Sequence, residues 1–180
     1  MDGEHCVKKA YEHILNSDFE GAIYWFEQAI AMEPSNASYY NKCAISCVRS
    51  GRWAKANNYA IRALELEPHN SEYLYHLHTI NARLLLIDAD AHLAKTPPNL
   101  EEALPLVQEA AKLDPLCFKA FYSLGAVYDG LGRWDEAAAS IREAIRLDPA
   151  HAAARTLFAA INRKRRMLKK NNGDKPSKER

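Results

Sequence analysis

The stretch FKAFYSLGAVYDGLGRWDEAAASIREAIRLDP, residues 118–149, decides the fold of this chain. Its closing phrase of an apolar residue, an acidic residue and a proline occurs three more times in the sequence. The four prolines are Pro34, Pro68, Pro115 and Pro149, so their spacings are 34, 47 and 34 residues. A fixed period of this length indicates an internal repeat of one supersecondary unit.

Each unit has the pattern of two helices. Ahead of Pro149, small or apolar residues fall at steps of four and three, at Ala137, Ile141 and Ala144, and the other units repeat these steps. Such steps place the residues on one stripe of a helix. Proline then ends the helix, because it lacks an N–H and disfavours a helical residue before it. The first half of the unit predicts a second helix, in which Gly125 indicates close approach of a neighbouring helix.

With these features the chain resembles the tetratricopeptide repeat family, over roughly residues 3–151. The second and fourth units fit the family pattern well, whereas the first is weak in its first helix and the third is interrupted. The matching residues of the fourth unit are Phe121, Leu124, Gly125, Tyr128, Ala137, Ile141, Ala144 and Pro149.

The resemblance implies an all-α fold in which repeats stack around one continuous core. We expect a right-handed α-α superhelical solenoid of four helical hairpins, closed by a C-terminal capping helix. The predicted segments are the repeats 3–36, 37–70, 71–117 and 118–151, a capping helix with a basic end at 152–170, and a disordered tail at 171–180.

The third unit is interrupted by an insertion around residues 84–98. From Leu84 to Lys95 nothing breaks a helix, which predicts that the first helix of this unit overruns by about two to three turns. Asn99 is placed to cap the following helix. The overrun is too apolar to be exposed to solvent on all sides, so two interpretations stay open. It packs within the chain, or it forms a contact surface for a partner or a second copy.

The first helix of each repeat lines a concave groove in the family. Its positions in this chain combine tyrosines with basic residues, and such a face suits a peptide that carries acidic residues. The peptide-binding residues that the resemblance assigns are Lys8, Tyr11, Asn41, Lys42, Ile45, Arg49, Tyr75, His76, Thr79, Arg83, Lys119, Tyr122 and Ser123.

Some family members use this groove as a clamp for the C-terminal carboxylate of heat-shock chaperones. The clamp needs lysine, asparagine and arginine at defined steps, and Glu72 would repel the carboxylate where a cation is required. We therefore expect no clamp of this kind. The residues that this chain has at those steps are Val7, Tyr11, Lys42, Glu72 and His76.

Charge is unevenly distributed along the chain. The net charge is +1, but residues 151–180 carry ten Lys or Arg against Asp174 and Glu179, a net of +8. This end is either a solvated helix end, favoured by the helix dipole, or a site for nucleic acid or another anionic surface. No aromatic residue interleaves with the charges, so base stacking is not expected. The candidate anion-binding residues are Arg163, Lys164, Arg165, Arg166, Lys169 and Lys170.

Catalytic and cofactor motifs are absent from the sequence, which has no Gly-rich phosphate loop, nucleophile elbow or paired-histidine zinc motif. Cys43 and Cys47 are spaced as zinc ligands could be, but no second ligand pair completes a site, and both are predicted to be small core residues. No signal peptide or membrane-spanning stretch is recognisable, so we expect a cytoplasmic protein.

The sequence therefore predicts a non-enzymatic scaffold, adaptor or co-chaperone-like module, without metal or cofactor, that binds a protein or peptide. Two alternatives remain open. One is a tether to nucleic acid or an anionic surface through the basic C-terminal end. The other is a scaffold that self-assembles through the overrun of the third unit.

Overall fold

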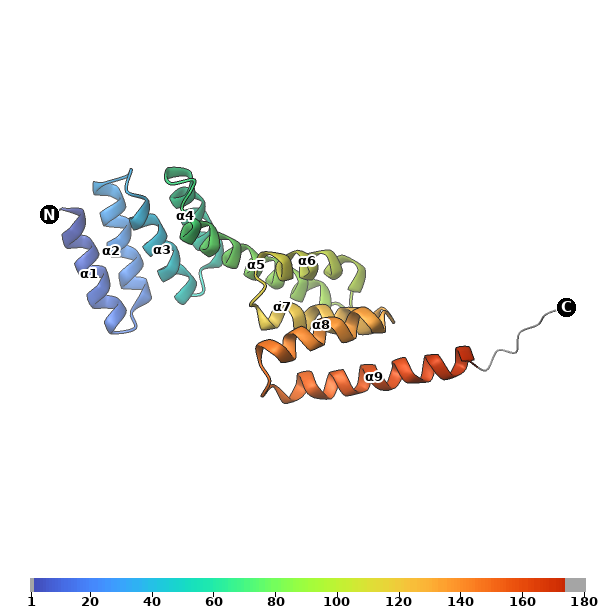
Figure 1. Ribbon diagram of the computed structural model, residues 1–180. Coiled ribbons are helices and arrows are strands. Elements are labelled where there is room, and N and C mark those ends of the chain that lie inside the picture. Colours follow the sequence, from blue (N-terminus) through green and yellow to red (C-terminus); the bar gives the residue numbers. More distant parts are fainter. Residues whose placement is uncertain (1, 174–180) are drawn as a thin grey trace. The chain divides into compact units, whose positions relative to one another are not determined.

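A computed structural model of the chain describes residues 2–173, and all regular secondary structure in that range is α-helical (Figure 1). The predicted all-α fold of helical hairpins is thereby confirmed. The helices are α1 (Gly3–Leu15), α2 (Phe19–Met32), α3 (Ala37–Arg49), α4 (Trp53–Leu66), α5 (Ser71–Leu93), α6 (Leu100–Leu113), α7 (Phe118–Gly130), α8 (Trp134–Leu147) and α9 (Ala152–Gly173).

The chain divides into two compact units, Met1–Leu84 and Leu85–Arg180. We call them unit 1 and unit 2. The boundary falls inside α5, which has 23 residues where α1, α3 and α7 have 13 each. The insertion in the third repeat therefore coincides with the boundary between the units.

The four repeat prolines end their helices in the same way. The residue before each proline is acidic and leaves the helical region, with ψ angles of 75°, 76°, 87° and 88° in chain order. Steric contact with the proline ring disfavours the helical conformation at this position, so each helix stops there. These residues are Glu33, Glu67, Asp114 and Asp148.

Three of the hairpin turns place one residue in the left-handed region. Gly51 and Gly132 have φ angles of 77° and 72°, whereas the α1–α2 turn has Ser17 at 59°. Glycine adopts this conformation freely, while other L-residues are strained in it. The first hairpin therefore carries backbone strain at a position where the second and fourth do not.

We expect Ser17→Gly to stabilise the chain by roughly 0.5–1 kcal/mol. The left-handed conformation costs an L-residue about 1–2 kcal/mol, and the greater unfolded-state entropy of glycine offsets part of the gain. Urea denaturation should show a higher midpoint at an unchanged slope. The control is Ser35→Gly, in an exposed turn without a positive φ, where no gain is expected. Equal shifts in both variants would contradict the assignment of strain to Ser17.

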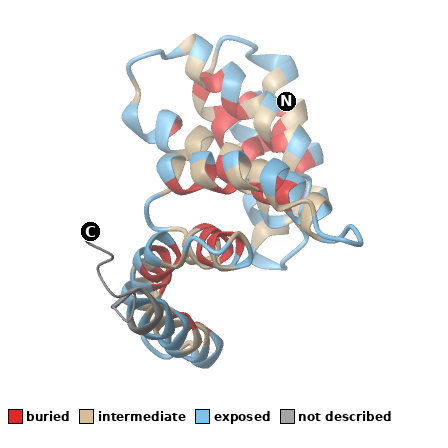
Figure 2. Cartoon of the chain, turned by 90° about the vertical axis from the view of Figure 1, so that its right-hand side faces the viewer, coloured by how far each residue is buried: buried red, intermediate tan, exposed pale blue. Residues whose placement is uncertain are grey.

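Each unit has its own buried core (Figure 2). In unit 1, Phe26 packs with Cys43 and Cys47, both fully buried free thiols, as predicted for small core residues. The hydrogen bond with Cys47 and burial raise the pKa of the Cys43 thiol far above its ordinary range, so this thiol stays protonated. In unit 2, Val107 and Ile141 are fully buried.

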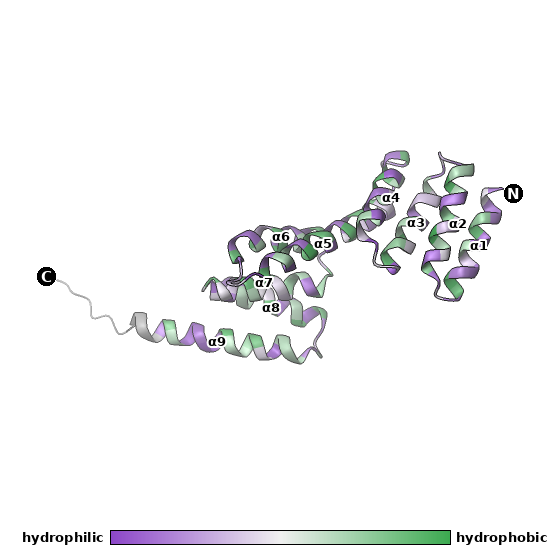
Figure 3. Ribbon diagram, turned by 180° about the vertical axis from the view of Figure 1, so that it is seen from behind, coloured by the Kyte–Doolittle hydropathy of each residue, from purple (hydrophilic) through white to green (hydrophobic). Residues whose placement is uncertain are grey.

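The second half of α5 is rich in apolar residues (Figure 3) but also contains the exposed Asp88 and Asp90. Leu86 and Ala89 are fully buried, whereas Ile87 is exposed. This burial favours packing within the chain over a broad self-association surface. The next helix, α6, begins where Asn99 caps it, with the Asn99 side chain accepting a hydrogen bond from the Glu102 backbone N–H at 3.3 Å.

Helix α9 covers the end of unit 2. Ile161 is fully buried, and Leu157 and Phe158 are partly buried where α9 packs on α8 and α7. The helix continues to Gly173, three residues into the segment 171–180 that the sequence predicted to be disordered, because no helix breaker precedes that glycine. The remainder of that predicted tail lies outside the described residues.

Candidate functional site

Unit 1 has two hollows along the helices that the family pattern assigns to the groove. The first hollow lies between α1 and α3 and has a volume of about 550 Å³. It combines apolar and basic side chains from both helices. Its lining residues are Glu4, Val7, Lys8, Tyr11, Asn36, Ser38, Tyr39 and Lys42.

Tyr11 is the central aromatic residue of the first hollow. Val7 and Lys8 lie about one helical turn before Tyr11 on α1, while Ala10 faces the core. The Tyr11 ring meets Phe26 edge-on, with centroids 6.0 Å apart, and the Lys42 Nζ lies 5.9 Å from its centroid. These contacts orient the ring, which is still 46% exposed and available to a ligand.

The second hollow lies between α3 and the first part of α5 and has a volume of about 190 Å³. Ile45, 40% exposed, gives it an accessible apolar side chain, and the exposed Arg49 gives it a positive charge. The Thr79 Oγ1 is buried and has no hydrogen-bond partner within residues 2–173. The lining residues are Ile45, Val48, Arg49, His76, Thr79 and Ile80.

Asn41 and His76 connect α3 with α5. The His76 Nδ1 donates to the Asn41 Oδ1 at 2.8 Å, and Asn41 is only 5% exposed. A buried side-chain amide with this partner holds the two helices together. The sequence predicts that Asn41 contacts a peptide, but the structure makes it a support for the residues around it.

The other predicted groove residues are placed differently. In unit 1, Tyr75 is exposed, and the Arg83 guanidinium lies 5.4 Å from the centre of the Trp53 ring. Lys119, Tyr122 and Ser123 belong to unit 2. There Lys119 forms an ion pair with Asp90, Tyr122 stacks on Phe118 with centroids 5.7 Å apart, and Ser123 is buried. The predicted residues that the structure brings to the two hollows are Lys8, Tyr11, Lys42, Ile45, Arg49, His76 and Thr79.

Sequence reasoning missed several lining residues that lie one helical turn from predicted ones. Tyr39 precedes Lys42 by three positions, Val48 follows Ile45 by three, and Ile80 follows His76 by four. Helical spacing alone could have identified them. The Tyr39 hydroxyl donates to the Glu33 carboxylate at 3.4 Å, and burial together with that negative charge raises the pKa of Tyr39.

The predicted anion-binding residues of α9 form two groups. Lys164 and Arg165 form ion pairs with Asp129 and Asp135. Arg163, Arg166 and Lys169 are exposed. The side chain of Lys170, also predicted, lies outside the described residues.

Residues 99–162 match the sequence profile of the tetratricopeptide repeat family. The fold is also that of a solved MamA protein, which matches with a TM-score of 0.55 and 21% identity over 91% of this chain and 82% of that one. Residues 99–162 therefore belong to the tetratricopeptide repeat family. A MamA from Desulfovibrio magneticus RS-1 covers 97% of both chains with a TM-score of 0.54 at 14% identity. Likeness at this level of identity concerns the fold alone.

The chain also matches parts of larger curated proteins. Serine/threonine-protein phosphatase 5 of Rattus norvegicus is 30% identical over 115 residues, which is 61% of this chain and 23% of the phosphatase. The Homo sapiens protein of the same name is 34% identical over 64 residues, 36% of this chain and 13% of that one. The chain therefore spans less than a quarter of the length of these relatives.

None of the helices α1–α9 combines the length and hydropathy that a membrane span requires. Within residues 2–173, no group of three or more His, Cys, Asp or Glu side chains is placed to hold a metal ion.

Proposed function

We propose that this tetratricopeptide repeat protein is a protein-interaction module that holds a peptide segment of its partner across the two hollows of unit 1. The observation that carries the proposal is the arrangement of the hollows on α1, α3 and α5. Each combines an accessible apolar side chain, Tyr11 or Ile45, with basic side chains beside it. Grooves of repeat proteins bind extended or helical segments in this way.

The lining indicates the chemistry of the partner segment. The larger first hollow suits an aromatic or long apolar side chain, and the smaller second hollow suits an aliphatic one. Lys8, Lys42 and Arg49 favour acidic residues between or beside these anchors. A groove of this size and polarity binds with micromolar affinity, about −8 kcal/mol.

The proposed ligand is an internal segment rather than a free C-terminus. Tyr11 fills a position where a carboxylate clamp needs a polar donor, and Glu72 brings a negative charge to the start of α5. His76 is bonded to Asn41. A synthetic partner peptide with an amidated C-terminus should therefore bind as tightly as the free acid.

We expect Lys42→Glu to weaken binding of the partner segment by at least about tenfold. The substitution replaces attraction by repulsion at the edge of the first hollow, and close charges interact by about 1–4 kcal/mol near a protein surface, where about 1.4 kcal/mol is tenfold. Affinity capture from native lysate with mass spectrometry would identify the partner. Truncation of the partner would define the shortest segment of it that still binds. Calorimetry would then compare the affinities of the wild type and the Lys42→Glu variant for that segment.

The matched control for Lys42→Glu is Arg62→Glu, on α4. Arg62 is exposed, and its ion pair with Glu65 lies on the same helix. The variant has the same change of net charge, and its affinity should equal that of the wild type. If both variants lose affinity equally, the loss is explained by the change in net charge. If Lys42→Glu binds as tightly as the wild type, the first hollow is not part of the binding site.

A further inference from the structure

Helix α9 carries basic residues, most of them from position 163 on, and no acidic ones. Its residues, 152–173, include Arg and Lys but no Asp or Glu, so any acidic partner must come from another element. Asp129 of α7 accepts the Lys164 ammonium with both carboxylate oxygens at 2.7 Å. Asp135 of α8 binds the Arg165 guanidinium at 2.6 Å. These two pairs fix the inner side of α9 on unit 2.

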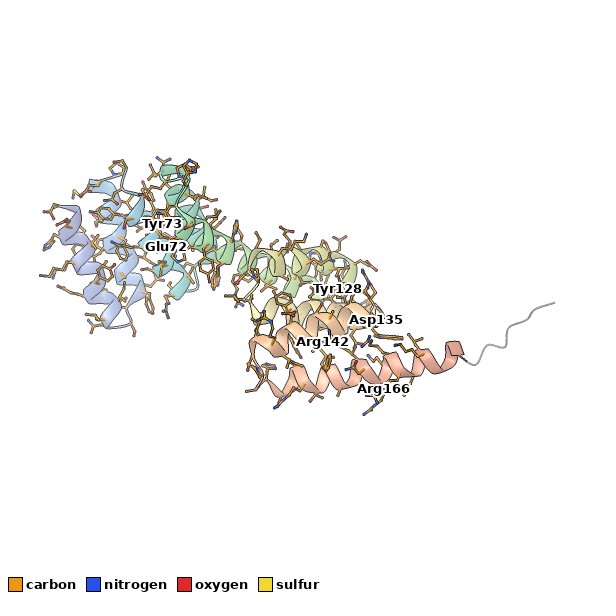
Figure 4. All side chains as sticks on the ribbon, in the orientation of Figure 1. Glu72, Tyr73, Tyr128, Asp135, Arg142 and Arg166 are labelled. Carbon is orange, nitrogen blue, oxygen red and sulfur yellow. The ribbon has the colours of Figure 1, made fainter. Side chains whose placement is uncertain are left out.

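Arg163, Arg166 and Lys169 form a second group, which we call the outer cations. All three are exposed, and none of their side chains has a hydrogen bond or ion pair to another residue in the part of the chain that the structure describes. Figure 4 shows Arg166 on the side of α9 that points away from α8, while Asp135 lies next to α9. Steps of three residues bring the outer cations onto successive turns, about 5–6 Å apart.

Two of the outer cations, Arg166 and Lys169, line a small notch in the surface of α9. Asn162, Arg165, Arg166 and Lys169 surround about 200 Å³ of open space. The Asn162 Oδ1 accepts from the Arg165 guanidinium at 3.0 Å, which leaves the amide N–H groups of Asn162 free to donate. The notch therefore offers donors of hydrogen bonds and positive charge, which is the chemistry that an oxyanion requires.

The apolar side of α9 is not available for a membrane. Ile161 is fully buried and Leu157 and Phe158 are partly buried against unit 2. A helix that lies in a membrane interface needs a free face of large apolar residues opposite its charges. At the basic end, Met167 and Leu168 are the only exposed large apolar side chains of the described part of α9.

We infer that the outer cations bind the phosphate backbone of nucleic acid without reading its sequence. A row of cations of one sign, one helical turn apart, fits a polymer with regularly spaced negative charges, such as a phosphate backbone. Guanidinium groups bind phosphate oxygens in pairs. No aromatic side chain lies among the outer cations, so base stacking is not expected.

The test uses the full chain and fluorescently labelled DNA duplexes of two unrelated sequences, with anisotropy measured between about 50 and 200 mM salt. We expect equal binding of both duplexes. The triple variant Arg163→Gln/Arg166→Gln/Lys169→Gln should bind at least about tenfold more weakly and should reduce the slope of log affinity against log salt by about 2.7, at about 0.9 for each of three phosphates. Glutamine favours helix, so circular dichroism should not change.

The matched control is Lys95→Gln/Lys112→Gln/Arg146→Gln, which removes the same charge from exposed positions elsewhere in unit 2. It should bind DNA like the wild type. Equal losses in the two triple variants would overturn the inference, because net charge would then explain binding. The inference would also be overturned if the chain did not bind DNA at about 50 mM salt, or if it preferred one duplex sequence. Binding of anionic phospholipid vesicles or polyglutamate in place of DNA would overturn it as well.

Discussion

The double variant Tyr11→Ala/Ile45→Asp is expected to bind the partner segment about 100-fold more weakly than the wild type, or worse, while the chain stays folded. Truncation of an anchor in a groove costs about 2 kcal/mol or more, and a carboxylate in an apolar hollow adds a desolvation cost. Tyr11 is 46% and Ile45 is 40% exposed. The unliganded chain therefore loses little packing.

The control for the groove double variant is Tyr24→Ala/Ile61→Asp. These residues lie on α2 and α4 of the same unit and are 55% and 40% exposed, so both the chemistry and the exposure are matched. Calorimetric titration with the mapped partner segment should give wild-type affinity for this control. If the two double variants lose affinity equally, or if neither does, the two hollows are not the binding site.

The second large effect is expected in the core of unit 2, where Gly125 of α7 meets Ile141 of α8. A Cβ at position 125 would lie closer to the Cγ1 and the Cδ1 of Ile141 than van der Waals contact allows, and Ile141 is itself fully buried. Gly125→Ala should therefore destabilise the chain by about 1–3 kcal/mol through overpacking. Ile141→Ala should cost about 2–5 kcal/mol through the cavity that it leaves.

These two substitutions should compensate each other when combined. The new methyl group at position 125 occupies part of the space that Ile141 vacates, so the double variant should be more stable than the sum predicts by at least about 1 kcal/mol. Urea denaturation of the four proteins measures this coupling. The control cycle combines Ile141→Ala with Gly132→Ala, which strains a residue at φ 72° where an added methyl group would enter open space. In that cycle the two losses of stability should add. Additive losses in both cycles would contradict the close contact between positions 125 and 141.

The helical fold could be predicted because its causes are local. A proline after an acidic residue ends a helix whatever surrounds it, and Pro34 and Pro149 act alike although they lie in different units. Gly125 could be identified because glycine inside a helix has a cost that close packing explains. The same is true of Asn99, whose capping role depends only on the residues that follow it.

The remainder depends on pairs of residues far apart in the sequence. Asn41 is buried and bonded to His76, 35 positions later in the sequence. Lys164 is paired with Asp129, which is also 35 positions away. The boundary inside α5 likewise arises from which neighbours each half of the helix packs against. The groove prediction, which stays a prediction, took residues from the first helices of all four repeats, whereas the two hollows are lined by residues of α1, α3 and α5. It therefore included residues such as Tyr122, which packs within unit 2.

The most direct test of peptide binding in unit 1 is photo-crosslinking in native lysate. A photoreactive amino acid is placed either at Ile45, in the second hollow, or at Ile61, which is equally exposed on α4. We expect a discrete protein adduct from position 45 that disappears when Lys42→Glu is added, and no such adduct from position 61. A discrete adduct from position 61 alone, or one from position 45 that Lys42→Glu leaves unchanged, would contradict the proposed binding groove.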